Sequence, residues 1–225
     1  MTMMRIAIIS MYFASAAYAD TWTVDDNGKA DFVRIQEAID ASSNGDEIIV
    51  HGGTYVESIN FNGKAISIQG SGAIATKILG TKSSAPVVTF NSGESNTSVL
   101  DGFFITGGSG ATFLDPIFGL VPCGGGIFIE LSSPTISNCV IENNAAWGGA
   151  GMFVTEGTPT IAGCIFRGNT AEGHGGGIYA IDSANPTINN TLFEGNVATW
   201  GAGMTCTVSS DANITSCTFA MNTTN

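Results

Sequence analysis

Basic residues are scarce in this sequence, and so are charged residues in general. Of the 225 residues, 12% are charged, with only 7 Lys or Arg against 19 Asp or Glu. Because so acidic a chain repels phosphate backbones, we expect no nucleic-acid partner. The 2 His and 5 Cys form no cluster and no C-x-x-C spacing. We therefore expect no metal site of the zinc type.

Long apolar runs are also missing. Beyond residue 19, no stretch approaches the ~20 consecutive apolar residues of a membrane-spanning helix. A shorter apolar run, Ile6 to about Phe13, follows the single charge of Arg5 and precedes the small-x-small pattern Ala17-Tyr18-Ala19. This arrangement is typical of a signal peptide, here residues 1–19, and predicts a secreted or cell-surface protein. Its removal leaves 206 residues with a net charge of −13.

Glycine, by contrast, is abundant, with 30 residues, and the second half of the chain repeats around it. Four units of 25 to 27 residues begin with glycine clusters at 124–126, 149–151, 175–177 and 201–203. Each unit is too short for a propeller blade, and its alternating runs broken by Gly, Pro and Asn are typical of strands. We therefore predict an all-β, right-handed parallel β-helix over residues 20–225, in which each unit forms one coil.

In such a stack, equivalent positions form columns along the axis, with neighbouring strands ~4.8 Å apart. Four columns have inward parity and form the predicted core: Ile127/Met152/Ile178/Met204, Ile129/Val154/Ala180/Cys206, Ile136/Ile161/Ile188/Ile214 and Ile141/Phe166/Phe193/Phe219. The column Cys139/Cys164/Thr191/Cys217 is expected to hold buried free thiols, because side chains that point in parallel have poor disulfide geometry.

A further column of asparagines closes each unit. It contains Asn144, Asn169, Asn196 and Asn222, each three residues after the Ile or Phe of the core. Stacked side-chain amides can donate to and accept from the neighbouring coil, so we expect an asparagine ladder at a turn.

Two outward columns supply the candidate ligand-binding residues. Phe128, Phe153 and Tyr179 lie between inward residues, and the second set, Trp147, His174 and Trp200, precedes the glycine clusters. Exposed aromatic rings in a row could bind sugar rings. A neighbouring loop or subunit could equally cover the first column, and a lone His between tryptophans is more typical of packing than of catalysis.

Charged residues form one further outward column, made of Glu142, Arg167 and Glu194. Its simplest interpretation is a surface salt-bridge ladder of small energetic weight. The alternative is a lyase-like site, in which Arg167 abstracts a proton and the carboxylates hold Ca²⁺. Glu130, Glu156, Asp182 and Asp211 gather at another edge, where we expect them to lie out of register.

The first half of the chain is less regular. Residues 31–43 carry an apolar stripe and predict a helix, which would cap the exposed end of the stack. Residues 47–50, 65–68, 86–90 and 99–105 are predicted strands of the early coils. Residues 109–122 interrupt the repeat. They form either a loop that provides a binding face or a loop that folds onto the stack and screens its own apolar groups.

These segments resemble known families. The stretches Ile35-Gln36-Glu37-Ala38-Ile39-Asp40, Gly45-Asp46-Glu47-Ile48, Gly53-Thr54-Tyr55-Val56-Glu57 and Gly63-Lys64-Ala65-Ile66 resemble the cap and first coils of pectate-lyase-like right-handed β-helix proteins. The later Gly-Gly-Gly-Ile and Phe-x-x-Asn units resemble repeats of polymorphic outer-membrane proteins and related bacterial surface proteins. The resemblance implies the fold but not a function, because the shared residues are structural. Catalytic members of the superfamily place Asp clusters and a basic residue on one strand face, and no matching group occurs here.

We therefore expect a secreted or surface-exposed scaffold that binds glycans or other cell-surface partners without catalysis. The alternative is a carbohydrate-active enzyme of the pectin-lyase-like type, either a polysaccharide lyase or a glycoside hydrolase. A third, weaker hypothesis is ice binding by the outward polar columns that begin at Thr135 and Ser137. The last coil ends in phase and without a cap, so we also expect either further coils beyond Asn225 or end-to-end self-association.

Overall fold

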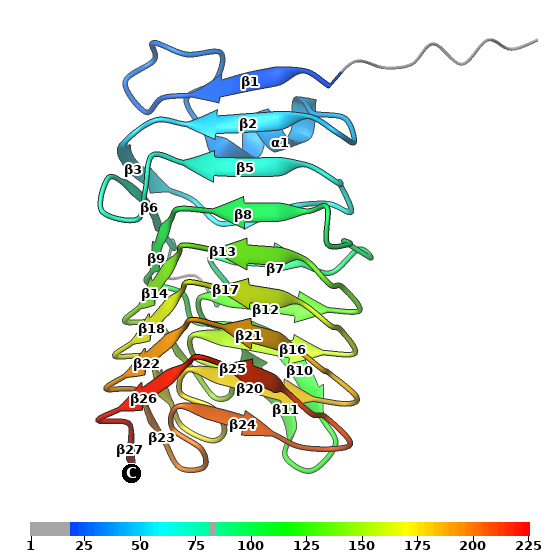
Figure 1. Ribbon diagram of the computed structural model, residues 1–225, viewed down its shortest axis with the longest axis vertical. Coiled ribbons are helices and arrows are strands. Elements are labelled where there is room, and N and C mark those ends of the chain that lie inside the picture. Colours follow the sequence, from blue (N-terminus) through cyan, green and yellow to red (C-terminus); the bar gives the residue numbers. More distant parts are fainter. Residues whose placement is uncertain (1–18, 82–83) are drawn as a thin grey trace, which may run out of the picture.

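The computed structural model describes residues 19–81 and 84–225, which form a stack of parallel coils (Figure 1). The predicted parallel β-helix is thus confirmed. The predicted signal peptide, apart from Ala19, lies outside the described residues. Within residues 19–81 and 84–225, no helix has the length and apolar character needed to cross a membrane.

Sheet A has eight strands, one from each coil, and all pair in parallel. Its strands are β1 (Thr21–Val24), β2 (Glu47–Val50), β5 (Ser67–Gly70), β8 (Val99–Asp101), β13 (Thr135–Ser137), β17 (Thr160–Ala162), β21 (Thr187–Asn189) and β25 (Asn213–Thr215). The outward polar columns at Thr135 and Ser137 are aligned as expected, with mixed residue types.

From β2 onward, each strand of sheet A is followed by a strand of sheet B after a turn. In the five turns after β8, β13, β17, β21 and β25, one residue has a positive φ, at Gly102, Asn138, Gly163, Asn190 and Ser216, a conformation that glycine and asparagine tolerate best. The seven strands of sheet B are β3 (Gly53–Val56), β6 (Thr76–Leu79), β9 (Phe104–Thr106), β14 (Val140–Glu142), β18 (Ile165–Arg167), β22 (Leu192–Glu194) and β26 (Thr218–Ala220).

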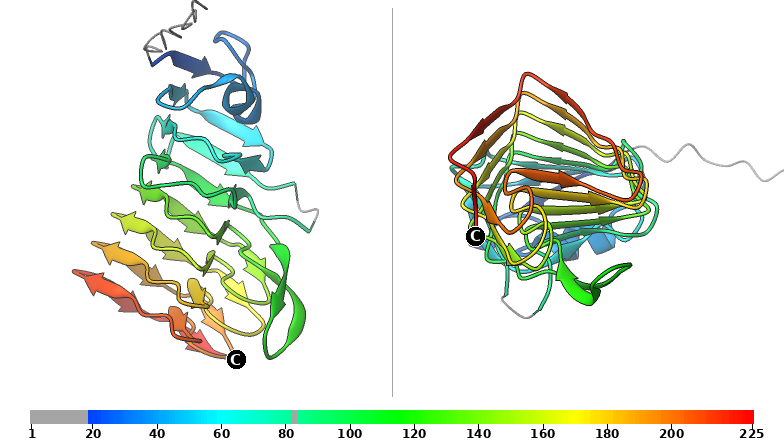
Figure 2. Two further views of the ribbon diagram at one scale, coloured as in Figure 1. Left: turned by 90° about the vertical axis from the view of Figure 1, so that its right-hand side faces the viewer. Right: turned by 90° about the horizontal axis from the view of Figure 1, so that it is seen from below.

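Two further sheets complete the coils. Sheet C contains β4 (Ile59–Asn60), β7 (Val88–Phe90), β12 (Ile127–Glu130), β16 (Met152–Thr155), β20 (Ile178–Ile181) and β24 (Met204–Cys206). The narrow sheet D contains β15 (Ala145–Ala146), β19 (Thr170–Ala171), β23 (Val197–Ala198) and β27 (Thr223–Thr224). Seen along the axis, the sheets surround one common interior (Figure 2). The inward side chains form a continuous hydrophobic core there.

One excursion leaves the stack. Strands β10 (Ala111–Asp115) and β11 (Gly119–Cys123) pair in antiparallel fashion and form a hairpin. The hairpin lies along the side of the lower coils and projects beyond their outline (Figure 2).

The predicted core columns are confirmed. Each pairs in register across the coils, and its members are buried until the last coil. The rings of Phe166 and Phe193 stack at 5.1 Å with an interplanar angle of 8°. In the last coil the same columns are partly exposed to solvent, with Phe219 48% and Ile214 43% exposed. Self-association through this apolar end stays a prediction.

The predicted helix is confirmed but is shorter than residues 31–43. Helix α1 spans Ile35–Ala41, and its apolar side packs onto the first coils. The segment at Asp31 and Phe32 does not join it, because the backbone N–H and C=O groups of Phe32 pair with Thr23 and Asp25, next to β1. The helix begins instead where the buried carboxylate of Glu57 accepts the N–H groups of Ile35 and Gln36, at 2.9 and 3.1 Å.

The asparagine ladder is confirmed. The side-chain amide of Asn144 donates to Asn169 Oδ1 at 3.2 Å, Asn169 to Asn196 Oδ1 at 3.0 Å, and Asn196 to Asn222 Oδ1 at 2.9 Å. The same oxygens accept backbone N–H groups of the neighbouring coil. Because Asn144, Asn169 and Asn196 are buried, the bonds between them join consecutive coils where water is excluded.

The five cysteines are free thiols, as expected for the stacked column. Cys139 and Cys164 are buried and donate to backbone carbonyls of sheet A. Burial raises the pKa of the Cys123 thiol to about 12, so this thiol stays protonated and unreactive at neutral pH.

Candidate ligand-binding site

The outer face of sheet C is apolar and is covered by the hairpin. Phe128, Phe153 and Tyr179 align across β12, β16 and β20, but they are only 4%, 0% and 2% exposed. Phe113 of β10 packs on Phe153 with ring centroids 4.7 Å apart, and Val121 of β11 joins the same cluster. Of the two alternatives for this column, the structure therefore shows coverage by a neighbouring loop and not an exposed row, because burial of large aromatic area stabilises the docked hairpin.

Asp115, at the tip of the hairpin, fixes it to the coil. Its buried carboxylate accepts the N–H groups of Ile117 and Phe118 at 2.8 and 2.9 Å through Oδ1. Its Oδ2 accepts the Tyr179 hydroxyl at 3.2 Å, and that hydroxyl accepts from Thr207 at 3.2 Å. Since a buried carboxylate needs such partners, the hairpin tip and β20 are held together.

Asp115→Ala should loosen the hairpin. The substitution leaves two N–H groups and the Tyr179 hydroxyl without their acceptor, at a cost of about 1–3 kcal/mol. We expect faster chymotryptic cleavage next to Phe113 or Phe118, measured as the rate of limited proteolysis. Asp211→Ala, which removes an exposed carboxylate, is the control. Equal cleavage rates in both variants would contradict the role of Asp115.

The second aromatic set is brought together at one edge of sheet C. Phe118 of the hairpin turn contacts Trp147, His174 and Trp200, with ring centroids 4.7, 5.7 and 5.8 Å apart. The His174 ring lies 5.7 Å from that of Trp147 and 4.7 Å from that of Trp200. Trp200 remains 47% exposed and Phe118 43%. We call these four side chains the aromatic edge.

Phe118 was missed by the sequence analysis. A signal for it exists, because Asp115, Pro116 and Gly119 are typical turn residues between two alternating apolar runs. The pattern could have predicted a hairpin, but not which face the hairpin covers.

Two glycines make room for the aromatic rings. A Cβ atom at Gly148 would lie 2.8 Å from the Tyr179 ring, and one at Gly173 would lie 2.7 Å from the Trp147 ring. Either contact is closer than van der Waals packing permits. The bridges Cys123–Gly148 and His174–Trp200 hold the segment before each glycine cluster in register.

His174 acts as a packing ring in this cluster. It stacks between Tyr179, at 5.0 Å and 17°, and Trp200, at 4.7 Å and 26°. Burial lowers its pKa, and the opposing influence of Asp115 is smaller, so the imidazole is neutral at neutral pH. Its Nδ1 is buried and has no hydrogen-bond partner in the described part of the chain.

A small hollow adjoins the aromatic edge beside Trp147. Its volume is about 250 Å³, and its polar lining comes from Ser109, Thr170 and Glu172. The Ser109 hydroxyl is buried and finds no hydrogen-bond partner among the described residues. This hydroxyl therefore keeps an unused donor and acceptor beside the hollow.

The charged column lies on the outside of sheet B. Glu142, Arg167 and Glu194 align in register, and Arg167 Nη2 lies 2.6 Å from Glu142 Oε2. The Arg167 side chain is 46% exposed, so the ion pair adds little to stability. The predicted surface salt bridge is confirmed for Glu142 and Arg167. The lyase-like role of the three residues stays a prediction.

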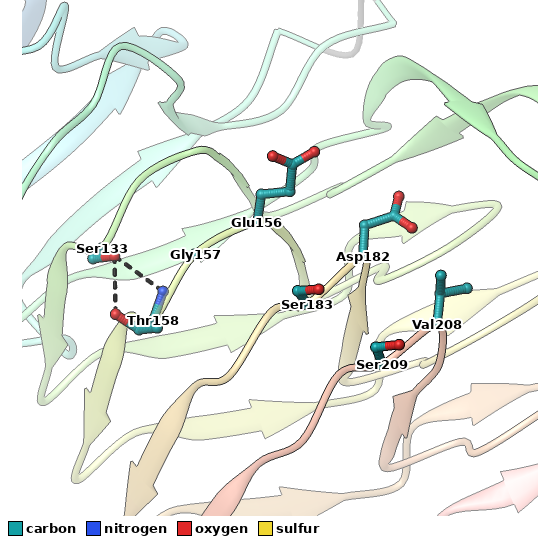
Figure 3. A pocket seen from close by; sticks show the side chains of 8 residues that line it. All are labelled: Ser133, Glu156, Gly157, Thr158, Asp182, Ser183, Val208 and Ser209. Carbon is teal, nitrogen blue, oxygen red and sulfur yellow. Dashed lines mark hydrogen bonds between the residues drawn. The ribbon is translucent and has the colours of Figure 1, made fainter.

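Another set of carboxylates lines an open hollow of about 480 Å³ at the far edge of sheet C. Glu156 and Asp182 directly follow the paired residues Thr155 and Ile181, and Figure 3 shows their side chains projecting from consecutive turns. The expectation that these two lie out of register is therefore wrong. Strands β16 and β20 have equal length, so the residues that directly follow them occupy matching positions. The repeat units differ in length, and this difference hid the match in the sequence. Ser133 and Thr158 share a hydrogen bond of 3.1 Å in the same hollow.

Asp182→Asn should stabilise the fold at neutral pH. Partial burial and then the charge of Glu156 raise the pKa of Asp182 above 3.8, so folding favours its protonated form. The free energy of unfolding of the wild type therefore falls relative to that of the variant as the pH rises. The fall begins near 3.8, the ordinary pKa of the unfolded state, and is complete above the raised pKa of the folded state. We expect a gain of up to about 1 kcal/mol at pH 7 that vanishes at pH 3, measured by denaturant unfolding. An equal gain at both pH values would contradict this origin.

Metal ligation has no obvious place in the described residues. Among residues 19–81 and 84–225, no group of three or more His, Cys, Asp or Glu side chains is placed to hold an ion. Any Ca²⁺ requirement stays a prediction.

Comparisons with known proteins place the fold. The profile of the right-handed β-helix region family matches residues 101–225, more than half of the chain. No curated protein sequence matches. A pectin methylesterase in complex with a hexasaccharide is a structural neighbour, with a TM-score of 0.58 and 12% identity over 88% of this chain and 67% of that one.

Further structural neighbours belong to the same group of enzymes. A mutant pectin methylesterase with another hexasaccharide has a TM-score of 0.51 and 11% identity over 78% of this chain and 66% of that one. The pectin methylesterase from carrot has a TM-score of 0.50 and 13% identity over 93% of this chain and 86% of that one. At such identities the likeness concerns the fold alone. The parallel coils, the asparagine ladder and the family match together establish that this chain belongs to the right-handed β-helix family.

Proposed function

We propose that this protein is a secreted or surface-exposed β-helix scaffold that binds glycans through its aromatic edge, without catalysis. The observation that carries the proposal is the half-exposed pair Trp200 and Phe118, supported from beneath by Trp147 and His174. A signal-peptide pattern at residues 1–19 supports export.

The chemistry of sugars explains why such an edge suits them. One face of a pyranose ring presents mainly C–H groups, and a flat aromatic ring removes this face from water. The rigid rings are held by their neighbours before a ligand arrives, so little side-chain entropy is lost on binding. A few polar groups at the margin then select among sugars, as in other ligand sites.

The structural neighbours give independent support. Two of them are pectin methylesterases in complex with hexasaccharides, so the same fold presents oligosaccharide-binding surfaces in those proteins. In this chain the outer face of sheet C is closed by the hairpin, and the aromatic edge beside it stays accessible through Trp200 and Phe118.

Trp200→Ala should weaken glycan binding about tenfold or more, because it removes the most exposed ring of the edge. Isothermal titration calorimetry against a panel of soluble polysaccharides measures the effect. Arg167→Ala is the matched control, since Arg167 lies on sheet B and is paired with Glu142. Equal binding by wild type and Trp200→Ala would contradict the proposal, as would a loss in Arg167→Ala alone.

A carbohydrate-active enzyme is the second candidate. The adjacent carboxylates of Glu156 and Asp182 favour it, because a carboxyl group with a raised pKa can serve as a general acid. We expect no release of reducing ends or unsaturated products from the panel, with or without Ca²⁺. Hydrolysis lost in Asp182→Asn would establish a hydrolase, whereas cleavage lost in Arg167→Ala would establish the lyase-like column.

A further inference from the structure

We infer that the aromatic edge, together with the hollow beside Trp147, takes an uncharged glycan and discriminates against polyuronates. The inference rests on the proposed glycan binding and names its substrate class. It follows from the charges around the edge and from the polar groups in the hollow.

Positive charge is almost absent from this part of the protein. Between residues 84 and 225 the sequence has one Lys or Arg, Arg167, against ten Asp or Glu. Arg167 lies on sheet B and binds Glu142 at 2.6 Å, so it cannot serve the aromatic edge. A sugar carboxylate placed on the rings would find no cationic partner, although recognition of carboxylates in proteins relies on Arg or Lys.

Acidic side chains beside the aromatic edge disfavour an acidic sugar. Glu172 lines the hollow beside Trp147 and is exposed, and the carboxylate of Asp115 lies beneath Phe118. His174 supplies no compensating charge, because partial burial lowers the pKa of its imidazole, which is neutral at neutral pH. Unfavourable contacts of this kind select between ligands even where the attractive contacts are the same.

The hollow is suited to the hydroxyl groups of a neutral sugar. Ser109 offers a buried hydroxyl that has no partner among the described residues, Thr170 adds a second hydroxyl, and Glu172 can accept. With about 250 Å³, the hollow falls below the ~300–1,000 Å³ of sites for larger ligands, so it admits a single ring-sized group. The aromatic edge continues from it across the coils of Trp147, His174 and Trp200, which suits further rings of the same chain.

Two pairs of polymers, each with one backbone and with either uncharged or carboxylate substituents, test the inference by calorimetry. They are hydroxyethyl cellulose against carboxymethyl cellulose, and methyl-esterified against de-esterified polygalacturonate. We expect the uncharged member of at least one pair to bind at least about tenfold more tightly at low salt. The difference should shrink at high salt, because carboxylate repulsion is screened.

Two variants locate the effect. Glu172→Gln should raise affinity for the carboxylated polymer about threefold, and Ser109→Ala should weaken binding of the uncharged one about three- to tenfold. Tighter binding of the carboxylated members overturns the inference but leaves glycan binding intact. No binding of any of the four polymers overturns the proposed function as well.

Discussion

Phe193→Ala is expected to lower the free energy of unfolding by about 3–5 kcal/mol, as other large truncations in protein cores do. Phe193 is fully buried, and its ring stacks between those of Phe166, at 5.1 Å, and Phe219, at 4.5 Å. Removal of the ring leaves a cavity that spans three coils, and each coil can pack only against its neighbours. Urea unfolding followed by far-UV circular dichroism measures the loss.

Phe219→Ala is the matched control for this substitution. It removes the same side chain from the same column, but Phe219 is 48% exposed at the end of the stack. We expect a loss of about half the Phe193 value or less, since less apolar area returns to water. Equal losses in both variants, or a near-wild-type Phe193→Ala, would contradict the inward assignment of the column.

Asn169→Ala should cost about 2–4 kcal/mol, although it deletes only a small polar side chain. The amide donates to the Ile141 carbonyl at 2.9 Å and to Asn196 Oδ1 at 3.0 Å. Its oxygen accepts the backbone N–H and the side chain of Asn144, at 3.1 and 3.2 Å. All these partners are buried, so the substitution leaves them unsatisfied where water cannot replace the lost bonds.

Asn213→Ala gives the comparison for a surface asparagine of the same stack. Asn213 is exposed on β25, and we expect a change within about 0.5 kcal/mol. A loss for Asn169→Ala no larger than that for Asn213→Ala would show that the ladder does not stabilise the coils.

The regular part of the fold could be predicted because each coil repeats the same pattern of inward apolar residues and turn residues. The inward parity of Ile136 and Ile161, and the asparagine three residues after Phe166, recur at a fixed spacing. A repeat that cannot bury its apolar face alone must stack, and stacking fixes the register of every column.

The irregular contacts could not be predicted, because they join residues far apart in the sequence. Glu57 sets the first residue of α1 from 22 positions downstream. Asp115 reaches Tyr179 across 64 positions and thereby decides that the outer face of sheet C is closed. Neither contact produces a periodic pattern in the sequence. A hairpin that interrupts a repeat is compatible with docking on several faces of the stack.

The candidate site divides in the same way. The positions of Trp147, His174 and Trp200 follow from the repeat and were predicted. The burial of Phe128 and the contact of Phe118 with this edge both depend on the hairpin: the first remained one of two alternatives, and the second was not predicted. The site is therefore formed jointly by a repeated edge and a single excursion.

Tryptophan fluorescence tests the central claim most directly. The chain has three tryptophans. Trp22 lies on β1 near α1, whereas Trp147 and Trp200 belong to the aromatic edge. In a Trp22→Phe variant, the account predicts that an uncharged polysaccharide shifts the emission and protects it from acrylamide quenching, in step with the calorimetric binding curve. Calorimetric binding with unchanged emission and unchanged quenching would place the ligand elsewhere and contradict the account.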